Sequence, residues 1–372
     1  MKVQRDHGMD ALRTLAVVAM MASHTARLIS FDLRPAWAQT VLLLEPLTPS
    51  LFLLLVGLSL TCSFEGAQER GTAAGAWFLR QARRAAVLWV ISTIFFTAEL
   101  GFRLPDAVTA SGILANIAYA IVLIAGLLTL PTGPLSRRLP LWLALLAGGL
   151  LFYWLDENGR SVFAVNTGNS PFLPLWLFAL TGAVWGSLFV RRTPKPVFPA
   201  RSTPSWIAPV LGLALGAVAF ALIARFGLDA LFSKPLGRSD AGRLTPAPIY
   251  GGSTLFLGYY NLRPTLSLCC LGIQLAGLTV LGAVFRKLPD RVASVAFALG
   301  RDALPAYILH LSLLAILVVS AGRQPLTAGW QVAGVWGMLV VVCMIFARWR
   351  KNRVKKASRR DRIGVYDPKP RA

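Results

Sequence analysis

Ten long apolar segments dominate this sequence and restrict the chain to a membrane. They lie at about residues 11–29, 43–64, 85–100, 111–130, 140–155, 171–190, 206–224, 265–285, 302–321 and 330–347. A helix needs about 20 largely apolar residues to cross a bilayer. Only 15% of the residues are charged, whereas a typical soluble domain has about 25%. We therefore predict an all-α, polytopic integral membrane protein of about ten transmembrane helices.

Positive charge is distributed unevenly among the segments that connect these helices. If the N-terminus is cytoplasmic, 26 of the 38 Lys and Arg residues fall in cytoplasmic segments and ten in the opposite segments. The positive-inside rule favours this orientation. We therefore expect both termini to be cytoplasmic and the protein to lie in the cell (inner) membrane. We interpret the net charge of +22 as this topological signal and expect no nucleic-acid partner.

The chain divides into a transmembrane domain, residues 1–347, and a basic tail, residues 348–372. The tail has few apolar residues, so we predict that it is disordered and rests on anionic lipid headgroups. We interpret it as a topological anchor; the alternative is a dedicated binding site. A loop rich in Gly and Pro, residues 226–264, is expected to form a partly ordered extracytoplasmic cap over a cavity.

Cysteine spacing indicates neither a metal site nor a disulfide framework. The four cysteines lie inside or beside apolar segments, without a Cys-x-x-Cys pair or a histidine at ligand spacing. We therefore expect no bound metal and no structural disulfide. The oligomeric state is left open by the sequence.

The first apolar segment carries ionisable residues, which are costly inside a membrane and commonly functional. Arg13 and His24 are eleven residues apart, which places them within about 20° of each other on one helical face. Asp10 precedes Arg13 by three residues and can pair with it. We predict that Arg13 and His24 point into one cavity. Alternatively, Arg13 is a flanking residue that reaches the interface, and His24 is a hydrogen-bonded histidine between helices.

Two later residues are candidates for the same cavity. His310 follows Tyr307 by three residues on one side of an apolar helix, although packing alone would also explain it. Glu45 stands between apolar residues and two nearby prolines. A broken helix at membrane depth is tolerated only where the backbone is buried in protein or lines a cavity. We therefore expect Glu45 to face His24 or water.

Three arginines, Arg80, Arg83 and Arg84, stand where the third apolar segment begins. Guanidinium groups bind phosphates through paired hydrogen bonds, so this cluster can hold a phosphate-bearing ligand. The same cluster is also explained as a positive-inside signal without any ligand.

The order of these residues resembles that of membrane acyltransferases. Residues 5–16, followed by an apolar run to His24, share with acyltransferase family 3 an Arg, ten residues and a His on the first helix. Segments 48–60, 171–176, 260–267 and 299–310 are more similar to bacterial relatives of heparan-alpha-glucosaminide N-acetyltransferase. The resemblance covers nearly the whole chain. It departs at Thr14, where glycine is usual, and at Ser23, where an acidic residue is often found.

This resemblance implies an O- or N-acyltransferase that moves an acyl group, expected to be acetyl, from cytoplasmic acyl-CoA to a hydroxyl or amine of an extracytoplasmic sugar, glycan or lipid-linked acceptor. An imidazole can act in such a reaction as a general base or as a covalent acyl carrier. No permanently bound cofactor is implied, and the expected partners are membrane lipids, acyl-CoA and the acceptor. The candidate catalytic residues are His24, Glu45 and His310, and the candidate acyl-CoA-binding residues are Arg13, Arg80, Arg83, Arg84 and Arg301.

Two other classes of protein stay open at this point. In a small-molecule transporter or flippase, Arg13, Glu45 and the two histidines would bind substrate or relay protons. A catalytically inactive membrane scaffold would keep the same helices without the reaction.

Overall fold

The computed structural model describes residues 7–29, 36–43, 45–100, 112–130, 138–160, 171–189, 207–232, 264–285, 288–321 and 326–364, with short pieces of the connecting segments. This part of the chain is helical, apart from turns and one isolated β-bridge between Ile29 and Leu326. The helices are α1 (His7–Ala26), α2 (Ala36–Leu43), α3 (Leu47–Glu69), α4 (Ala74–Leu100), α5 (Asp106–Thr109), α6 (Ile113–Thr129), α7 (Leu139–Glu157), α8 (Phe172–Phe189), α9 (Ile207–Phe232), α11 (Pro264–Phe285), α12 (Asp290–Ala296), α13 (Ala298–Arg301), α14 (Ala303–Ser320) and α15 (Gly329–Gly364).

Each apolar segment found in the sequence falls on one helix of the structure. Within the described residues, α3, α7, α9, α11, α14 and α15 are long and apolar enough to cross a membrane, and α6 and α8 are apolar but shorter. The protein is therefore an all-helical, polytopic membrane protein with six to eight apolar helices of spanning length. Helices α1 and α4 carry more ionisable side chains. The total of ten crossings stays a prediction.

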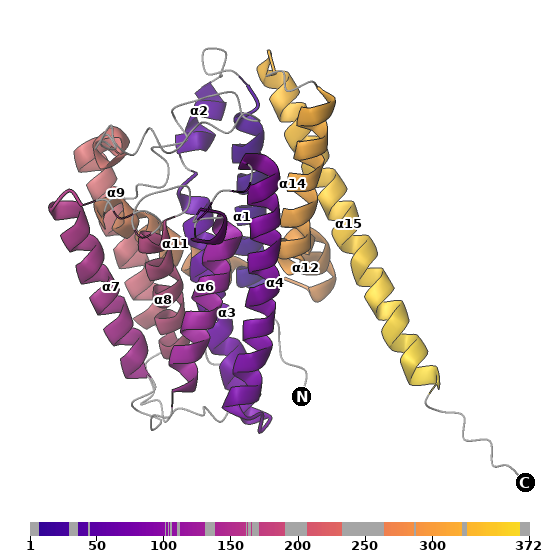
Figure 1. Cartoon of the computed structure of the whole chain (residues 1–372), viewed down its shortest axis with the longest axis horizontal. Helices are drawn as coiled ribbons and strands as arrows, with labels where there is room; N and C mark the ends of the chain where they lie inside the picture. The colour runs from indigo at the N-terminus through magenta and orange to yellow at the C-terminus, as the bar shows by residue number, and fades with distance from the viewer. Residues whose placement is uncertain are drawn as a thin grey trace, which may run out of the picture.

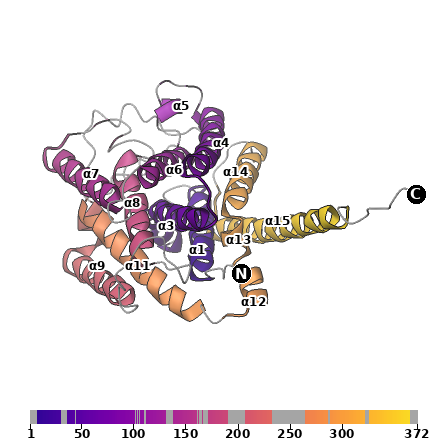
Figure 2. The same ribbon diagram turned by 90° about the horizontal axis from the view of Figure 1, so that it is seen from below.

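Helices α1 and α3 lie in the middle of the bundle, surrounded by three groups of helices (Figure 2). One group contains α4, α6, α7 and α8, and a second is the pair of α9 and α11. The third group contains α12 to α15 and packs along α1 (Figure 1). Because α1 contacts α3, α11, α13, α14 and α15, it connects the parts of the bundle.

Both ends of the described chain lie on the same side of the bundle. Near the start of α1, Asp10 pairs with Arg301, and the neighbouring Asp302 accepts a hydrogen bond of 3.4 Å from Arg350, late in α15. At the opposite side, the backbone N–H of Leu326 donates to the carbonyl of Leu28. We call these two sides the Asp10 end and the Leu28 end. Helices α1 and α15 therefore run antiparallel, as an even number of crossings requires (Figure 1).

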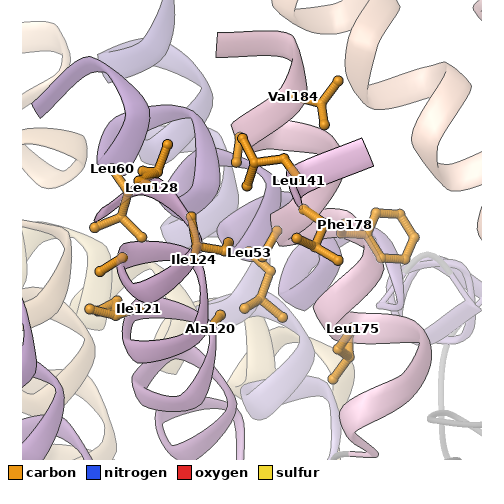
Figure 3. Close-up of a cluster of buried hydrophobic side chains, with 14 of the residues drawn as sticks. Leu53, Leu60, Ala120, Ile121, Ile124, Leu128, Leu141, Leu175, Phe178 and Val184 are labelled. Carbon is orange, nitrogen blue, oxygen red and sulfur yellow. The ribbon is translucent and has the colours of Figure 1, made fainter. Parts of the chain in front are cut away.

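The largest apolar cluster joins α3, α6, α7 and α8 (Figure 3). Leu53 and Leu60 of α3 are buried against Ile124 and Leu128 of α6, and Phe178 of α8 belongs to the same cluster. Because lipid tails are as apolar as leucine, such helices are held together by close packing rather than by exclusion from water. Close approach of the backbones therefore matters in this bundle.

Two helices extend into segments that we expected to form a tail and a loop. Helix α15 continues to Gly364, and the disorder of residues 348–372 stays a prediction. Arg350 pairs with Asp302, and the guanidinium of Arg353 lies 4.3 Å from the centre of the Trp349 ring, which stabilises these turns. Helix α9 likewise extends into the predicted loop, to Phe232. Residues 233–263 and 365–372 lie outside the described residues.

Helices α3 and α8 cross most closely at two glycines. A Cβ atom at Gly57 would lie 1.8 Å from the carbonyl oxygen of Ala179, and one at Gly182 would lie 1.9 Å from that of Leu54. These neighbours are backbone atoms, which cannot rotate away. Small residues are needed wherever membrane helices approach this closely.

We predict that Gly57→Ala lowers the stability of the purified protein in detergent by about 3 kcal/mol, because α3 and α8 must separate to admit the methyl group. The control is Gly126→Ala on α6, where no atom lies within 4 Å of the added Cβ, and which should be neutral or slightly stabilising. Thermal unfolding followed by circular dichroism compares the two variants. Equal melting temperatures would contradict the close crossing.

Candidate functional site

A buried carboxylate joins two guanidinium groups at the Asp10 end. The Oδ1 atom of Asp10 lies 3.4 Å from Nη1 of Arg13, and Oδ2 lies 3.0 Å from Nε of Arg301. The Asp10 side chain is 1% exposed, whereas those of Arg13 and Arg301 are 22% and 14% exposed. We call these three residues the Asp10 cluster. Two cations and one anion leave it with a net charge of +1, on guanidinium groups that solvent still reaches.

Helices α1, α3 and α13 position the Asp10 cluster. Arg13 donates a hydrogen bond to Ser59 of α3. The hydroxyl of Thr14 donates to the carbonyl of Asp10 and accepts from the N–H of Gly300. A Cβ atom at Gly300 would lie 2.0 Å from the carbonyl oxygen of Asp10, so only glycine permits this approach of α13 to α1. Thr14, which replaces the usual glycine, therefore connects the two helices.

A histidine pair lies farther along α1. Nδ1 of His24 is 3.1 Å from Nε2 of His310, and the two rings stack with centroids 5.3 Å apart. Nδ1 of His310 is 3.2 Å from the carbonyl oxygen of Ala306, and the Tyr307 ring packs edge-on against His310. His310 is fully buried, whereas His24 is partly exposed. The structure thus places His310, a candidate for the same cavity, against His24; its catalytic role stays a prediction.

Hydrogen-bonding rules assign the protons in this pair when both rings are neutral. A carbonyl oxygen only accepts, so Nδ1 of His310 must donate to Ala306. Nε2 of His310 then carries a lone pair and must accept from Nδ1 of His24. This leaves Nε2 of His24 unprotonated. His24 therefore presents a basic nitrogen, while its other nitrogen is held by His310.

Among the described residues, the hydrogen-bond partner of Glu45 is Arg27 rather than His24, one of the two surroundings, His24 or water, that we expected it to face. Its Oε1 atom accepts a hydrogen bond from Arg27, and both side chains are buried. Arg27 follows His24 by three residues, so Glu45 lies near the same end of α1 as His24. Its ion-pair partner, however, is Arg27. The two prolines beside Glu45 behave as expected, since Pro46 and Pro49 stand at the start of α3, at the Leu28 end.

The three arginines of α4 are spread along the surface of that helix. Arg80, Arg83 and Arg84 are exposed, and Arg84 donates to Gln81 of the same helix. Trp77, one turn before Gln81 on α4, donates to Ser63 of α3. Ser63 lies one turn after Ser59, which accepts from Arg13. Since one helical turn rises about 5.4 Å, these arginines lie at a depth similar to that of Arg13. The ion-pair partners that the structure describes for Asp10 are Arg13 of α1 and Arg301 of α13, and not these arginines of α4.

Arg13 and His24 share a helix but contact different neighbours. Arg13 contacts α3, whereas His24 contacts α14. That both side chains point into one cavity stays a prediction. Asp10 and His24 are fourteen positions apart, about 21 Å along the helix, so we describe the Asp10 cluster and the histidine pair as separate sites.

The residues that sequence analysis missed are those paired across helices. Arg27 and Ser59 were not candidates, although Arg27 stands one turn after His24. Arg27 could have been found from its spacing, because residues three positions apart on a helix lie side by side and Arg27 is three positions after the candidate His24. Ser59 carries no such signal. The four cysteines are free and buried, and within the described residues no group of three or more His, Cys, Asp or Glu could hold a metal ion.

The fold and the two sites define a polytopic membrane protein with ionisable groups inside a helical bundle. The family profile of acyltransferase family 3, described as an acyltransferase domain, matches residues 6–348. The chain therefore belongs to acyltransferase family 3 and is a membrane acyltransferase. The comparison with curated proteins gives no match.

Membership in this family decides between the classes left open by the sequence. It identifies an enzyme that uses an acyl donor, which the transporter and scaffold alternatives do not describe. It gives no support to the closer likeness to relatives of heparan-alpha-glucosaminide N-acetyltransferase. The acyl group and the acceptor are not specified by the match.

We predict that Asp10→Asn lowers the stability of the protein by about 3 kcal/mol, because it leaves Arg13 and Arg301 without their shared anion. The control is Asp290→Asn, which removes a carboxylate paired with His7 at 3.0 Å but 91% exposed, and which should change stability little. Thermal unfolding in detergent measures both. A similar loss of stability in the two variants would show that the burial of Asp10 does not increase the contribution of its ion pairs to stability.

Proposed function

We propose that the protein transfers an acyl group from a cytoplasmic acyl-CoA to an acceptor on the opposite side of the membrane, with His24 at the chemical centre. The observation that carries this proposal is the hydrogen bond between His24 and His310, which leaves one ring nitrogen of His24 basic. Family membership supplies the reaction class, and the histidine pair supplies a group suited to it.

The Asp10 end is the proposed entry of the acyl donor. An acyl-CoA brings several phosphate charges, and guanidinium groups bind phosphates well. Arg13 and Arg301 retain a net positive charge beside Asp10 and are partly exposed. The exposed arginines of α4 lie at a similar depth and add three further charges. The charge distribution along the sequence supports a cytoplasmic location for this end.

His24 is proposed to act as the general base. The acceptor oxygen attacks the thioester carbonyl carbon while its proton passes to Nε2 of His24. The carbon–sulfur bond then breaks, and the thiolate of CoA leaves and receives the proton. His310 keeps the ring of His24 oriented and holds its other nitrogen protonated during this transfer. If His24 instead carries the acyl group covalently, the same Nε2 forms the bond.

The finer assignments rest on the resemblance of the sequence. We propose acetyl-CoA as the donor, a sugar, glycan or lipid-linked acceptor, and the cell (inner) membrane as the location. Both termini are proposed to be cytoplasmic, in agreement with their common position at the Asp10 end. Relatedness to heparan-alpha-glucosaminide N-acetyltransferase stays part of this proposal.

The test of the function is acyl transfer by the purified protein, followed as release of free CoA thiol from acetyl-CoA with a panel of glycan acceptors. We predict that His24→Ala lowers the rate at least about 100-fold, because the proton acceptor is lost. His7→Gln is the control, since His7 is a histidine at the start of α1 that pairs with the exposed Asp290, away from the histidine pair. Turnover near that of the wild type in His24→Ala would eliminate the mechanism.

A second prediction separates orientation from packing at His310. In His310→Gln, the side-chain amide can donate to the carbonyl of Ala306 while its oxygen accepts from His24. In His310→Leu, the volume is similar but the acceptor is lost. We expect His310→Gln to retain most of kcat and His310→Leu to lose about 100-fold, with the KM for acyl-CoA unchanged in both. Equal kcat in the two variants would limit His310 to packing.

A further inference from the structure

A second buried polar site lies at the Leu28 end, between α3 and α11. Gln274 of α11 donates through Nε2 to the hydroxyl of Ser50, at 2.5 Å, and to the carbonyl of Leu47, at 3.2 Å. Glu45 stands two residues before Leu47, and its carbonyl accepts from the N–H of Thr48 in the same turn. Gln274 thus hydrogen-bonds to the first turn of α3, and Glu45 belongs to the turn directly before it.

Both side chains present an acceptor atom that has no hydrogen-bond partner among the described residues. Glu45 and Gln274 are each 4% exposed. Arg27 bonds Oε1 of Glu45, whereas no described residue donates to Oε2 of Glu45 or to Oε1 of Gln274. The buried hydroxyl of Ser267 likewise has no partner in the described part of the chain and stands seven residues before Gln274, on the same face of α11. We call Glu45, Gln274 and Ser267 the Glu45 site.

Unsatisfied buried acceptors specify the chemistry of what they bind. Each costs about 1–3 kcal/mol of desolvation unless a donor reaches it, and such atoms are rare in folded proteins. The Glu45 site has two atoms that only accept and one hydroxyl that can also donate. A ligand with several neutral hydroxyl groups satisfies all three. A phosphate or carboxylate has no proton to donate at neutral pH and is repelled by Glu45.

From this arrangement we infer that Glu45, Gln274 and Ser267 bind the hydroxyl groups of a neutral, polyhydroxylated acceptor. The inference rests on the proposed function, because it gives the acceptor of that reaction its own site. Arg27 connects the two sites: it holds Glu45 and follows His24 by one helical turn. Glu45 is thereby a binding residue for the acceptor rather than an orienting partner for the ring of His24.

Ligand-induced thermal stabilisation tests this site without requiring catalysis, since a ligand that binds the folded state raises the melting temperature. The probes are methyl glucoside and N-acetylglucosamine as neutral hydroxyl compounds, and glucose 6-phosphate as the anionic counterpart. We expect either neutral probe to raise the melting temperature of the wild type, and glucose 6-phosphate to do so less. In Glu45→Gln, which can still accept from Arg27 through its remaining oxygen, the stabilisation should disappear.

Acyl transfer from acetyl-CoA gives the second measurement. Glu45→Gln and Gln274→Met should each raise the KM for the acceptor about tenfold, the expected effect of one hydrogen bond, with the KM for acetyl-CoA unchanged. The matched control is Trp176→Phe, which removes another buried polar atom without a partner, on α8. It should leave both KM values unchanged.

Three results would overturn the inference. These are stabilisation by neither neutral probe, equal or greater stabilisation by glucose 6-phosphate, and unchanged stabilisation in both Glu45→Gln and Gln274→Met. Failure of the proposed function would look different: the neutral probes would stabilise the wild type and not Glu45→Gln, while no CoA was released from acetyl-CoA.

Discussion

The shared carboxylate of Asp10 is the interaction on which the arrangement of this protein depends. It holds Arg13 on its own helix and Arg301 on α13, at a point where Gly300 lets the two backbones touch. Since α14 begins two residues after Arg301, fixing α13 against α1 also fixes where α14 runs. His310 is thereby brought to His24. An ion pair made at one end of the bundle thus supports a hydrogen bond made deeper inside it.

The ionisable groups along the first helix follow one rule. In a bilayer, a charged or polar side chain is stable only when another group satisfies it. Asp10, His24 and Arg27 each meet a partner from a different segment, respectively α13, α14 and the turn before α3. A substitution at any one of them leaves a partner unsatisfied. These partners therefore position α1 in the bundle and satisfy its buried ionisable side chains.

The sequence predicted what depends on neighbours along the chain. Apolar length located the helices, and the spacing of three residues indicated that Asp10 pairs with Arg13. It could not predict that Arg301 or Arg27 would complete the ion pairs, because such contacts depend on which helical faces meet. The continuation of α15 through residues 348–364 agrees with local composition, because Lys, Arg and Ala favour helix and neither Pro nor Gly interrupts them before Gly364.

The two ends of the bundle differ in chemistry, and the proposed reaction depends on this difference. The Asp10 end carries excess guanidinium charge, which is suited to the phosphates of the proposed acyl-CoA donor. At the Leu28 end, Arg27 and Glu45 neutralise each other, and the remaining buried polar atoms accept hydrogen bonds. A phosphate-bearing donor would form few favourable contacts at the Leu28 end, and a neutral hydroxyl compound few among the arginines. In the proposed reaction each substrate is therefore favoured at one end of the first helix, with His24 between the two ends.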